Sequence, residues 1–99
     1  MSLRPPLYSD RAEADLRAIV RYSVHLFGAN QASTYLNTIQ RTCEEVASGR
    51  LRTRSHTIGN KNYWKRPIGA HVIYGRFDAD GRCLIVRILH SRMNAPDHL

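Results

Sequence analysis

The residues best suited to chemistry lie near the end of the chain, where Arg87, His90 and Arg92 are close together in the sequence. A histidine beside arginines can cleave a phosphodiester bond, because imidazole transfers protons and guanidinium groups stabilise charge on the phosphate oxygens. Arg66 is a fourth candidate for such a site. No tyrosine or glutamate near His90 completes the acid–base set. We therefore assign no catalytic residue and expect that the protein is not an enzyme.

The same segment carries residue types that suit contact with another macromolecule. Arg92 and Met93 follow the last apolar run and lie outside any alternation that would bury them, so they favour a partner contact. His90 either contacts a partner or bonds backbone at the end of a strand. Residues 94–99 contain a proline and are polar at their centre, so they form either a frayed tail or a segment that reaches the target.

The charge is distributed unevenly along the chain. Residues 1–49 carry five arginines and five acids, whereas residues 50–99 carry ten Lys and Arg against three Asp, so the net charge of +7 lies in the second half. Such a field favours an acidic partner, either polypeptide or nucleic acid, although a solvated basic face is the simpler alternative. The candidate contacts are Arg50, Arg52, Arg54, Trp64, Lys65 and Arg66. Trp64 is either an interface anchor or half-buried core.

Length and composition restrict the class of protein. The 99 residues suffice for one domain, residues 1–99, with a modest core. Cys43 and Cys83 are far apart in apolar segments, so we expect core thiols, no metal site and no cofactor. No apolar run is long enough to cross a membrane, and no secretory signal is evident at the start of the chain. We expect a cytoplasmic protein without membrane contact.

Apolar residues at helical spacing predict two helices joined by a short turn. The pattern from Ala12 to Phe27 follows Asp10-Arg-Ala-Glu13, which is typical of a capping box, and it places Leu26 and Phe27 on the buried face. Gly28 ends this helix. A second pattern runs to Gly49, with Asn30 as a candidate cap. We expect an antiparallel helical hairpin.

The rest of the chain predicts strands. Leu3–Tyr8 contains two prolines and suits only an edge strand, while residues 50–59 lack periodicity and are predicted to be loop. Strands are expected at residues 62–66, 70–77 and 82–90, the last two joined by a turn at 78–81. The fold class is α+β, a helical hairpin packed on an antiparallel sheet in the order β-α-α-β-β-β.

Alternation in the last predicted strand gives two apolar faces. One face carries Cys83, Ile85, Arg87 and Leu89, and the other carries Leu84, Val86, Ile88 and His90. Two apolar faces predict a central strand, and something must cover the second face at least in part.

Motifs spread over nearly the whole chain resemble those of the ParE branch of the ParE/RelE superfamily. The most specific segment is Ile88-Leu-His-Ser-Arg-Met93, followed by His98-Leu99. The other matching positions are Tyr8-Ser9, Ala12, Asp15-Leu16, Tyr22, Phe27-Gly28, Gln31-Ala32, Tyr35 and His71-Val-Ile-Tyr74.

The resemblance implies the toxin of a type II toxin–antitoxin system that inhibits DNA gyrase and blocks replication. It implies a ParD-like antitoxin with an acidic C-terminal segment, which forms a hetero-oligomer with the toxin and provides the only link to operator DNA. We expect the target to contact His90, Arg92, Met93, His98 and Leu99, and the antitoxin to contact the six basic-cluster residues named above.

Two alternatives belong to different classes of function. Relatives of the RelE kind cut messenger RNA on the ribosome, and the candidates for that activity here are His90, Arg66, Arg87 and Arg92. A degenerate, non-toxic module that only binds antitoxin is the other alternative.

Overall fold

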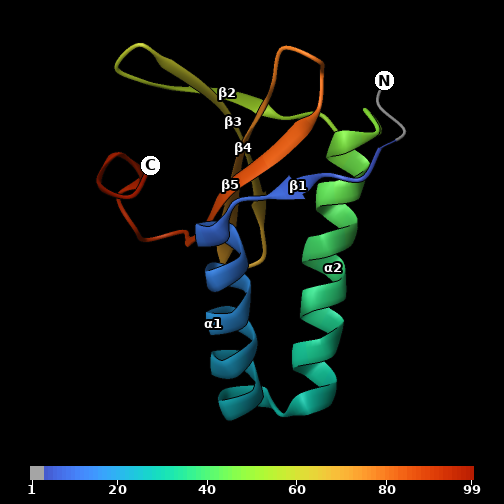
Figure 1. The fold of residues 1–99 in the computed structure, drawn as a ribbon. Helices are drawn as coiled ribbons and strands as arrows, with labels where there is room; N and C mark the ends of the chain where they lie inside the picture. Colours follow the sequence, from blue (N-terminus) through green and yellow to red (C-terminus); the bar gives the residue numbers. More distant parts are fainter. Residues whose placement is uncertain (1–3) are drawn as a thin grey trace.

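The fold is a helical hairpin on a five-stranded sheet. The computed structural model describes residues 4–99, and Figure 1 shows the arrangement. The elements are β1 (Leu7–Tyr8), α1 (Asp10–Phe27), α2 (Ala29–Ala47), β2 (Arg54–Ile58), β3 (Lys61–Ile68), β4 (His71–Phe77), β5 (Cys83–His90) and a short 3-10 helix, Ala95–Asp97. The strand order is β1-β5-β4-β3-β2. The α+β class and the packing of a helical hairpin on a sheet are confirmed, and β5 lies between two strands as its apolar faces predict.

The sheet is mixed, because its first strand runs parallel to the last. Leu7 pairs with Leu84 and Tyr8 pairs with Ile85, whereas all other strand pairs are antiparallel. The predicted edge strand therefore reduces to two residues after the prolines, which have no amide hydrogen to donate. Leu3, where that prediction began, lies outside the described residues.

The prediction of loop for residues 50–59 is wrong over β2. This strand pairs with β3 over five residues, from Arg54 opposite Lys65 to Ile58 opposite Lys61. Because β2 is the outermost strand, polar side chains on it remain in solvent and no apolar alternation is required. Gly59, with φ of 61°, provides the tight turn into β3.

Both predicted helix caps lie too late in the sequence, the first by one residue and the second by two, because Gly28 is the N-cap of α2. Ser9, not Asp10, caps α1: its hydroxyl accepts from the amide of Ala12 at 3.0 Å and donates to the carbonyl of Val86 at 2.6 Å. The second bond explains why Ser9 and not Asp10 is the cap, because the Ser9 hydroxyl caps the helix and also holds it to β5. Asn30 is not a cap, because α2 already begins at Ala29, directly after Gly28.

A β-bulge changes the faces of β5. Gly75 of β4 pairs with Ile85, but the preceding Tyr74 pairs with Arg87, so Val86 is the extra residue. The predicted alternation is therefore wrong after Ile85. Ile88 joins Ile85 in the core beneath the helices, and Arg87 turns to the outer face of the sheet, the face away from the helices.

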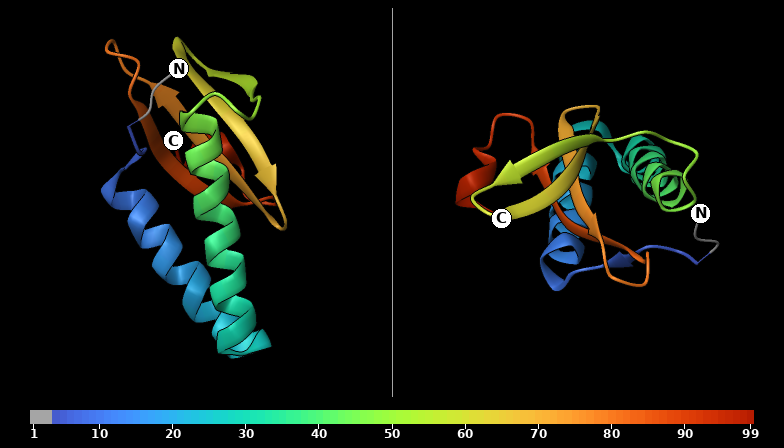
Figure 2. Two further views of the ribbon diagram at one scale, coloured as in Figure 1. Left: turned by 90° about the vertical axis from the view of Figure 1, so that its right-hand side faces the viewer. Right: turned by 90° about the horizontal axis from the view of Figure 1, so that it is seen from above.

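The core lies between the helical hairpin and the sheet, and a smaller cluster covers the outer face. Tyr74 and Leu89 on that face pack against Ala95 and Leu99 of the C-terminal segment, which lies on the opposite side of the sheet from α2 (Figure 2). The expectation that something covers the second face is confirmed. On the inner face, the Trp64 ring lies across Gly75, where an added Cβ would meet it at 2.2 Å.

We predict that Gly75→Ala destabilises the protein by about 2–4 kcal/mol, because the new methyl group overlaps the Trp64 ring and the backbone of β5. Urea unfolding measures the loss. In the double variant with Trp64→Leu, part of this cost should disappear, because a smaller side chain leaves room. If the losses of unfolding free energy in the two single variants simply add in the double variant, the proposed contact between residue 75 and Trp64 would be contradicted.

Candidate functional site

Arg87 is held in an ion pair that joins three parts of the fold. Its Nε and Nη2 donate to the two carboxylate oxygens of Asp15 at 2.8 and 2.9 Å, and its Nη1 donates to the carbonyl of His98 at 2.9 Å. The same carboxylate accepts from the amide of Ile88 at 2.9 Å. Hydrogen bonding to Asp15 raises the pKa of Arg87. Because every part of the guanidinium is engaged within the chain, Arg87 has a structural role here.

His90 lies at the exposed end of β5 and is bonded to backbone. Its Nδ1 accepts from the amide of Arg92 at 3.1 Å, which is the structural interpretation that the sequence left open. Its ring also lies edge-on to that of His71, with centroids 5.6 Å apart. The outer part of the His90 ring remains exposed.

Next to His90, a tyrosine fixes the turn between β3 and β4. The Tyr35 hydroxyl donates to the carbonyl of Ile68 at 3.1 Å and lies 2.7 Å from Nδ1 of His71. Burial lowers the pKa of His71, the nearby His90 lowers it further, and Asp15 acts in the opposite direction. The net effect favours the neutral imidazole of His71 over its charged form.

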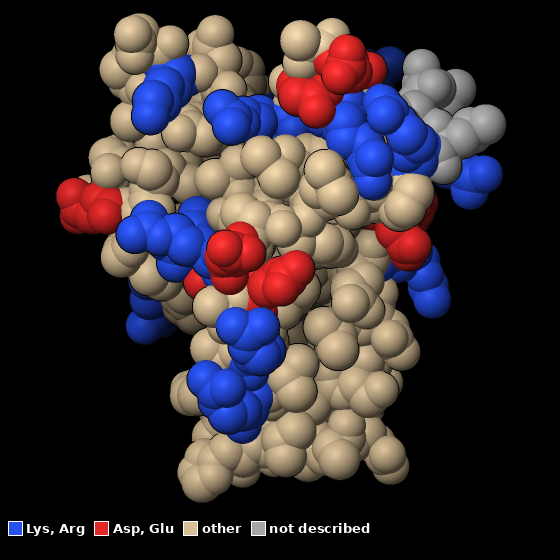
Figure 3. Space-filling view, viewed as in Figure 1, with Lys and Arg blue, Asp and Glu red and all other residues tan. Residues whose placement is uncertain are grey.

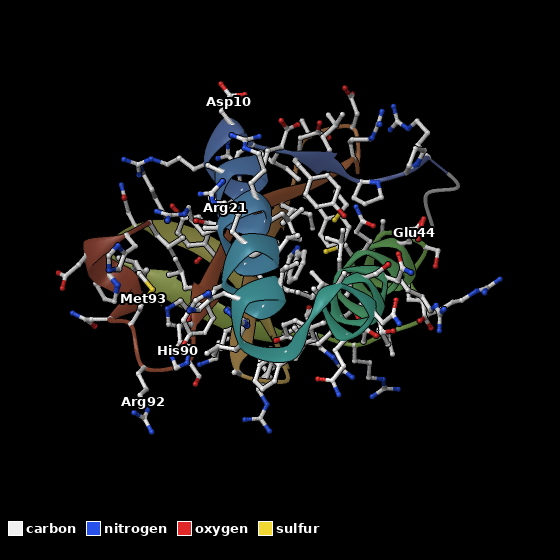
Figure 4. The ribbon with its side chains drawn as sticks, turned by 90° about the horizontal axis from the view of Figure 1, so that it is seen from below. Asp10, Arg21, Glu44, His90, Arg92 and Met93 are labelled. Atoms are coloured by element: carbon white, nitrogen blue, oxygen red, sulfur yellow. The ribbon has the colours of Figure 1, made fainter. Side chains whose placement is uncertain are left out.

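The residues proposed for target contact fall into two groups. His90 ends β5 and Arg92 and Met93 follow it, with Met93 39% exposed and Arg92 directed away from the molecule (Figure 4). His98 and Leu99 instead lie on the outer face, where Leu99 packs on the cluster around Tyr74 and Leu89. The end of the chain is thus a folded segment, and the frayed-tail alternative has no support.

The four candidates for phosphodiester cleavage do not converge. His90 lies on the inner face of the sheet, opposite His71, whereas Arg87 lies on the outer face and is engaged by Asp15. Arg66 lies two strands away on β3 and donates to the carbonyl of Arg52 at 3.1 Å. Only Arg92 is beside His90.

The basic cluster is also divided between the two faces of the sheet. Trp64 is only 6% exposed and belongs to the core, so core is the correct one of its two interpretations. Arg66 shares the inner face with Trp64, whereas Arg54 and Lys65 lie opposite each other on the outer face. Figure 3 shows Lys and Arg over the strands and also over α1, and few charges on the lower part of α2.

A groove of about 750 Å³ lies at the free end of the hairpin, and none of its helical residues was assigned to a partner contact from the sequence. The helices extend beyond the sheet (Figure 1), so Leu26 and Phe27, predicted to be buried, are 49% and 63% exposed, and Tyr22 is 66% exposed. His71 and His90 lie at its inner end. The available signal was the absence of Asp, Glu, Lys and Arg from residues 26–40. The groove is lined by Tyr22, Ser23, Leu26, Phe27, Asn30, Gln31, Thr34, Tyr35, Thr38, Ala70, His71 and His90.

Residues 4–99 offer neither a cluster of metal ligands nor a helix that could span a membrane. There, no three His, Cys, Asp or Glu side chains come together as metal ligands. In the same range, no helix combines the length and apolar character that crossing a bilayer requires.

We predict that Asp15→Asn destabilises the protein by about 2–4 kcal/mol, because it leaves the largely buried Arg87 charge without its carboxylate. Urea unfolding measures the loss, and limited proteolysis should show earlier cleavage of residues 91–99, which lose part of their anchor. The control is Arg92→Gln, which removes an exposed charge and should leave stability unchanged. Equal stability of the two variants would refute the structural role of the pair.

A second prediction concerns pH. The pKa of His71 is lower in the folded chain than its ordinary value of 6.5, so His71 binds a proton more readily in the unfolded chain. The free energy of unfolding should therefore fall as the pH drops below about 6.5. His71→Gln should flatten this part of the profile of unfolding free energy against pH. His25→Gln, at the exposed end of α1, is the control and should retain the wild-type profile. A wild-type slope in the His71 variant would contradict the assignment.

Comparison with known proteins agrees with this geometry. The model of the family described as ParE toxin of type II toxin-antitoxin system, parDE, matches residues 7–95. Toxin ParE1 of Caulobacter vibrioides is 34% identical over 97 residues, covering 98% of this chain and 99% of that protein. Toxin ParE1 of Mycobacterium tuberculosis is 29% identical over 93 residues, covering 94% and 95%.

A solved structure shares the fold. A chain of the chromosomal ParDE TA system from P. aeruginosa superposes with a TM-score of 0.74 at 17% identity, covering 89% of this chain and 96% of that one. The family match spans nearly the whole chain, and the fold has the same arrangement. This chain therefore belongs to the ParE toxin family of type II toxin–antitoxin systems.

Proposed function

We propose that this chain is an active toxin that inhibits DNA gyrase by binding it in the cytoplasm, and that a ParD-like antitoxin neutralises it. The gyrase target follows from the resemblance of the chain to ParE toxins. The proposal requires no catalytic step. It requires two binding surfaces, one for the antitoxin and one for the target.

The proposal that an antitoxin binds this chain is supported mainly by the uncharged groove at the free end of the hairpin. It exposes Tyr22, Leu26 and Phe27, which a chain acting alone would gain stability by burying. A groove between two helices fits the apolar face of a third helix, a common mode of peptide recognition. We therefore place an amphipathic helix of the antitoxin here.

The basic residues supply the second antitoxin contact. An acidic segment that follows the helix would meet Arg50 and Arg52, which lie exposed between α2 and β2, and Arg54, which is exposed at the start of β2. Lys65 extends this positive surface onto the outer face of β3, whereas Arg66 lies on the inner face of that strand. Trp64 is excluded from the contact because it is buried. Charge pairing of this kind accelerates association and weakens in salt.

Neutralisation follows if the two surfaces overlap. His90 lines the groove and also lies beside Arg92 and Met93, the exposed residues that we assign to gyrase contact. An antitoxin helix in the groove would cover His90 and approach Arg92. The toxin could then not bind antitoxin and gyrase at the same time.

The arrangement gives the ribonuclease alternative little support. The arginines that it needs are on different faces or engaged elsewhere, and His90 has one ring nitrogen bonded to backbone. The family of the chain points in the same direction. A degenerate module remains the alternative that experiment must separate from an active toxin.

We predict that purified toxin at micromolar concentration blocks gyrase supercoiling, and that Arg92→Ala with Met93→Ala lowers inhibition at least tenfold, because both side chains are exposed and lie on the proposed contact. Arg17→Ala with Val24→Ala, on α1 away from that segment, is the control. Full supercoiling with wild-type toxin, together with growth arrest on expression, would exclude gyrase as target. Normal growth would indicate the degenerate module.

The antitoxin contact is tested separately. Leu26→Arg with Phe27→Arg places charge in the groove without disturbing core, since both residues are exposed. We expect this variant to stay toxic when the adjacent antitoxin gene is co-expressed, whereas Arg17→Ala is still neutralised. Rescue of growth in both cases would place the antitoxin elsewhere.

A further inference from the structure

The outer face of the sheet carries cations that the fold does not use. We define the basic sheet patch as Arg54 on β2, Lys65 on β3 and Arg76 on β4. Arg54 lies directly opposite Lys65, and Lys65 lies opposite Tyr74, two positions from Arg76 on the same face. Two like charges at opposite cross-strand positions destabilise a sheet. Their presence is therefore unexplained by folding.

The stretch of chain that forms β2, β3 and β4 contains no acidic residue. Residues 46–77 contain no Asp or Glu and seven Lys and Arg: Arg50, Arg52, Arg54, Lys61, Lys65, Arg66 and Arg76. The ion pair between Arg87 and Asp15 is the one found within residues 4–99. The three patch cations accordingly hold no carboxylate among the described residues. An external polyanion would relieve their mutual repulsion.

Half-buried rings lie among the cations. Tyr63 is two positions from Lys65 on the same face and lies opposite His56. The His56 ring in turn contacts that of Tyr74, with centroids 5.3 Å apart. The patch thus combines positive charge with partly exposed aromatic surface, and the C-terminal segment packed on Tyr74 forms its border.

These features distinguish between two kinds of polyanion. An extended acidic peptide gains affinity by pairing its backbone with a free strand edge, but β3 and β4 are already paired on both sides, so only the outer edge of β2 is open to such a peptide. The cations are also spread over three strands, about 10 Å across, instead of following one edge. A phosphodiester backbone needs only the cations, and its bases can stack on rings.

We propose that the basic sheet patch, Arg54, Lys65 and Arg76, binds the phosphodiester backbone of a nucleic acid directly. This goes beyond the proposed function, in which the toxin meets DNA only through antitoxin. Its test needs neither gyrase nor antitoxin, but Arg54 and Lys65 are also assigned to the antitoxin contact, so an acidic antitoxin segment and a nucleic acid would compete for these two residues. The surface lies on the opposite side of the sheet from the helix-lined face.

The test is fluorescence anisotropy with labelled oligonucleotides of about twelve nucleotides. Single-stranded DNA, RNA of the same sequence and duplex DNA are compared with the full-length chain, and binding to any of them supports the proposal and identifies the source of the phosphate. Non-specific affinities near 10⁻⁴ to 10⁻⁶ M are expected. No binding in all three arms at low salt would overturn it.

A matched pair of variants locates the site. Arg54→Gln with Lys65→Gln and Arg76→Gln should lower affinity about tenfold or more and reduce the slope of log K against log salt by about 2, as three lost contacts to single strands require. Arg17→Gln with Arg21→Gln and Arg41→Gln, exposed on the helices, changes the net charge equally and should cost no more than about twofold. Equal losses in the two variants would show diffuse attraction and sink the proposal.

Two further readouts separate binding from folding and from an acidic peptide. Lys65→Gln should keep or raise the thermal midpoint while it weakens nucleic-acid binding, because it removes the opposed like charges. A fall in both would instead indicate a structural role. Poly-glutamate and unlabelled oligonucleotide are compared as competitors at equal concentrations of negative charge. If poly-glutamate displaces the labelled oligonucleotide at the lower concentration, the result would overturn the assignment in favour of an acidic polypeptide.

Discussion

The ion pair between Asp15 and Arg87 is the interaction on which the arrangement of the surfaces depends. One carboxylate holds the guanidinium and also accepts from the Ile88 amide, at the stretch of β5 that the two-residue β1 leaves uncovered. The guanidinium then holds the carbonyl of His98. First helix, last strand and C-terminal segment are thereby fixed to one another.

This connection determines where the exposed contact residues lie. Because residues 95–99 fold back onto the outer face, Arg92 and Met93 lie in the exposed bend between β5 and the 3-10 helix. The C-terminal segment covers Val72, Tyr74 and Leu89, which would otherwise leave an apolar outer face in water. The remaining outer face is basic.

A mismatch in length between helices and strands produces the groove. The helices have 18 and 19 residues, about 27 Å at 1.5 Å per residue, and their distal turns extend past the sheet (Figure 1). Side chains there keep the apolar pattern of a packed helix but have no sheet beneath them. The molecule thus separates an uncharged groove from a basic sheet, so that partners of different chemistry can bind different places.

The sequence by itself determined the two helices, three of the strands, the α+β class and the family, because these depend on periodicity and on motifs that are local in the chain. It could not reveal β2, whose polar residues pair with β3 only in the tertiary structure, or the Ser9 cap, which also bonds Val86 across the sheet. The bulge at Val86 reversed the faces of the last strand after Ile85, so that Ile88 and His90 lie on the helix-lined face and Arg87 lies on the outer face. Burial of Trp64 and exposure of Phe27 likewise depend on what packs against them, which no spacing along the chain encodes.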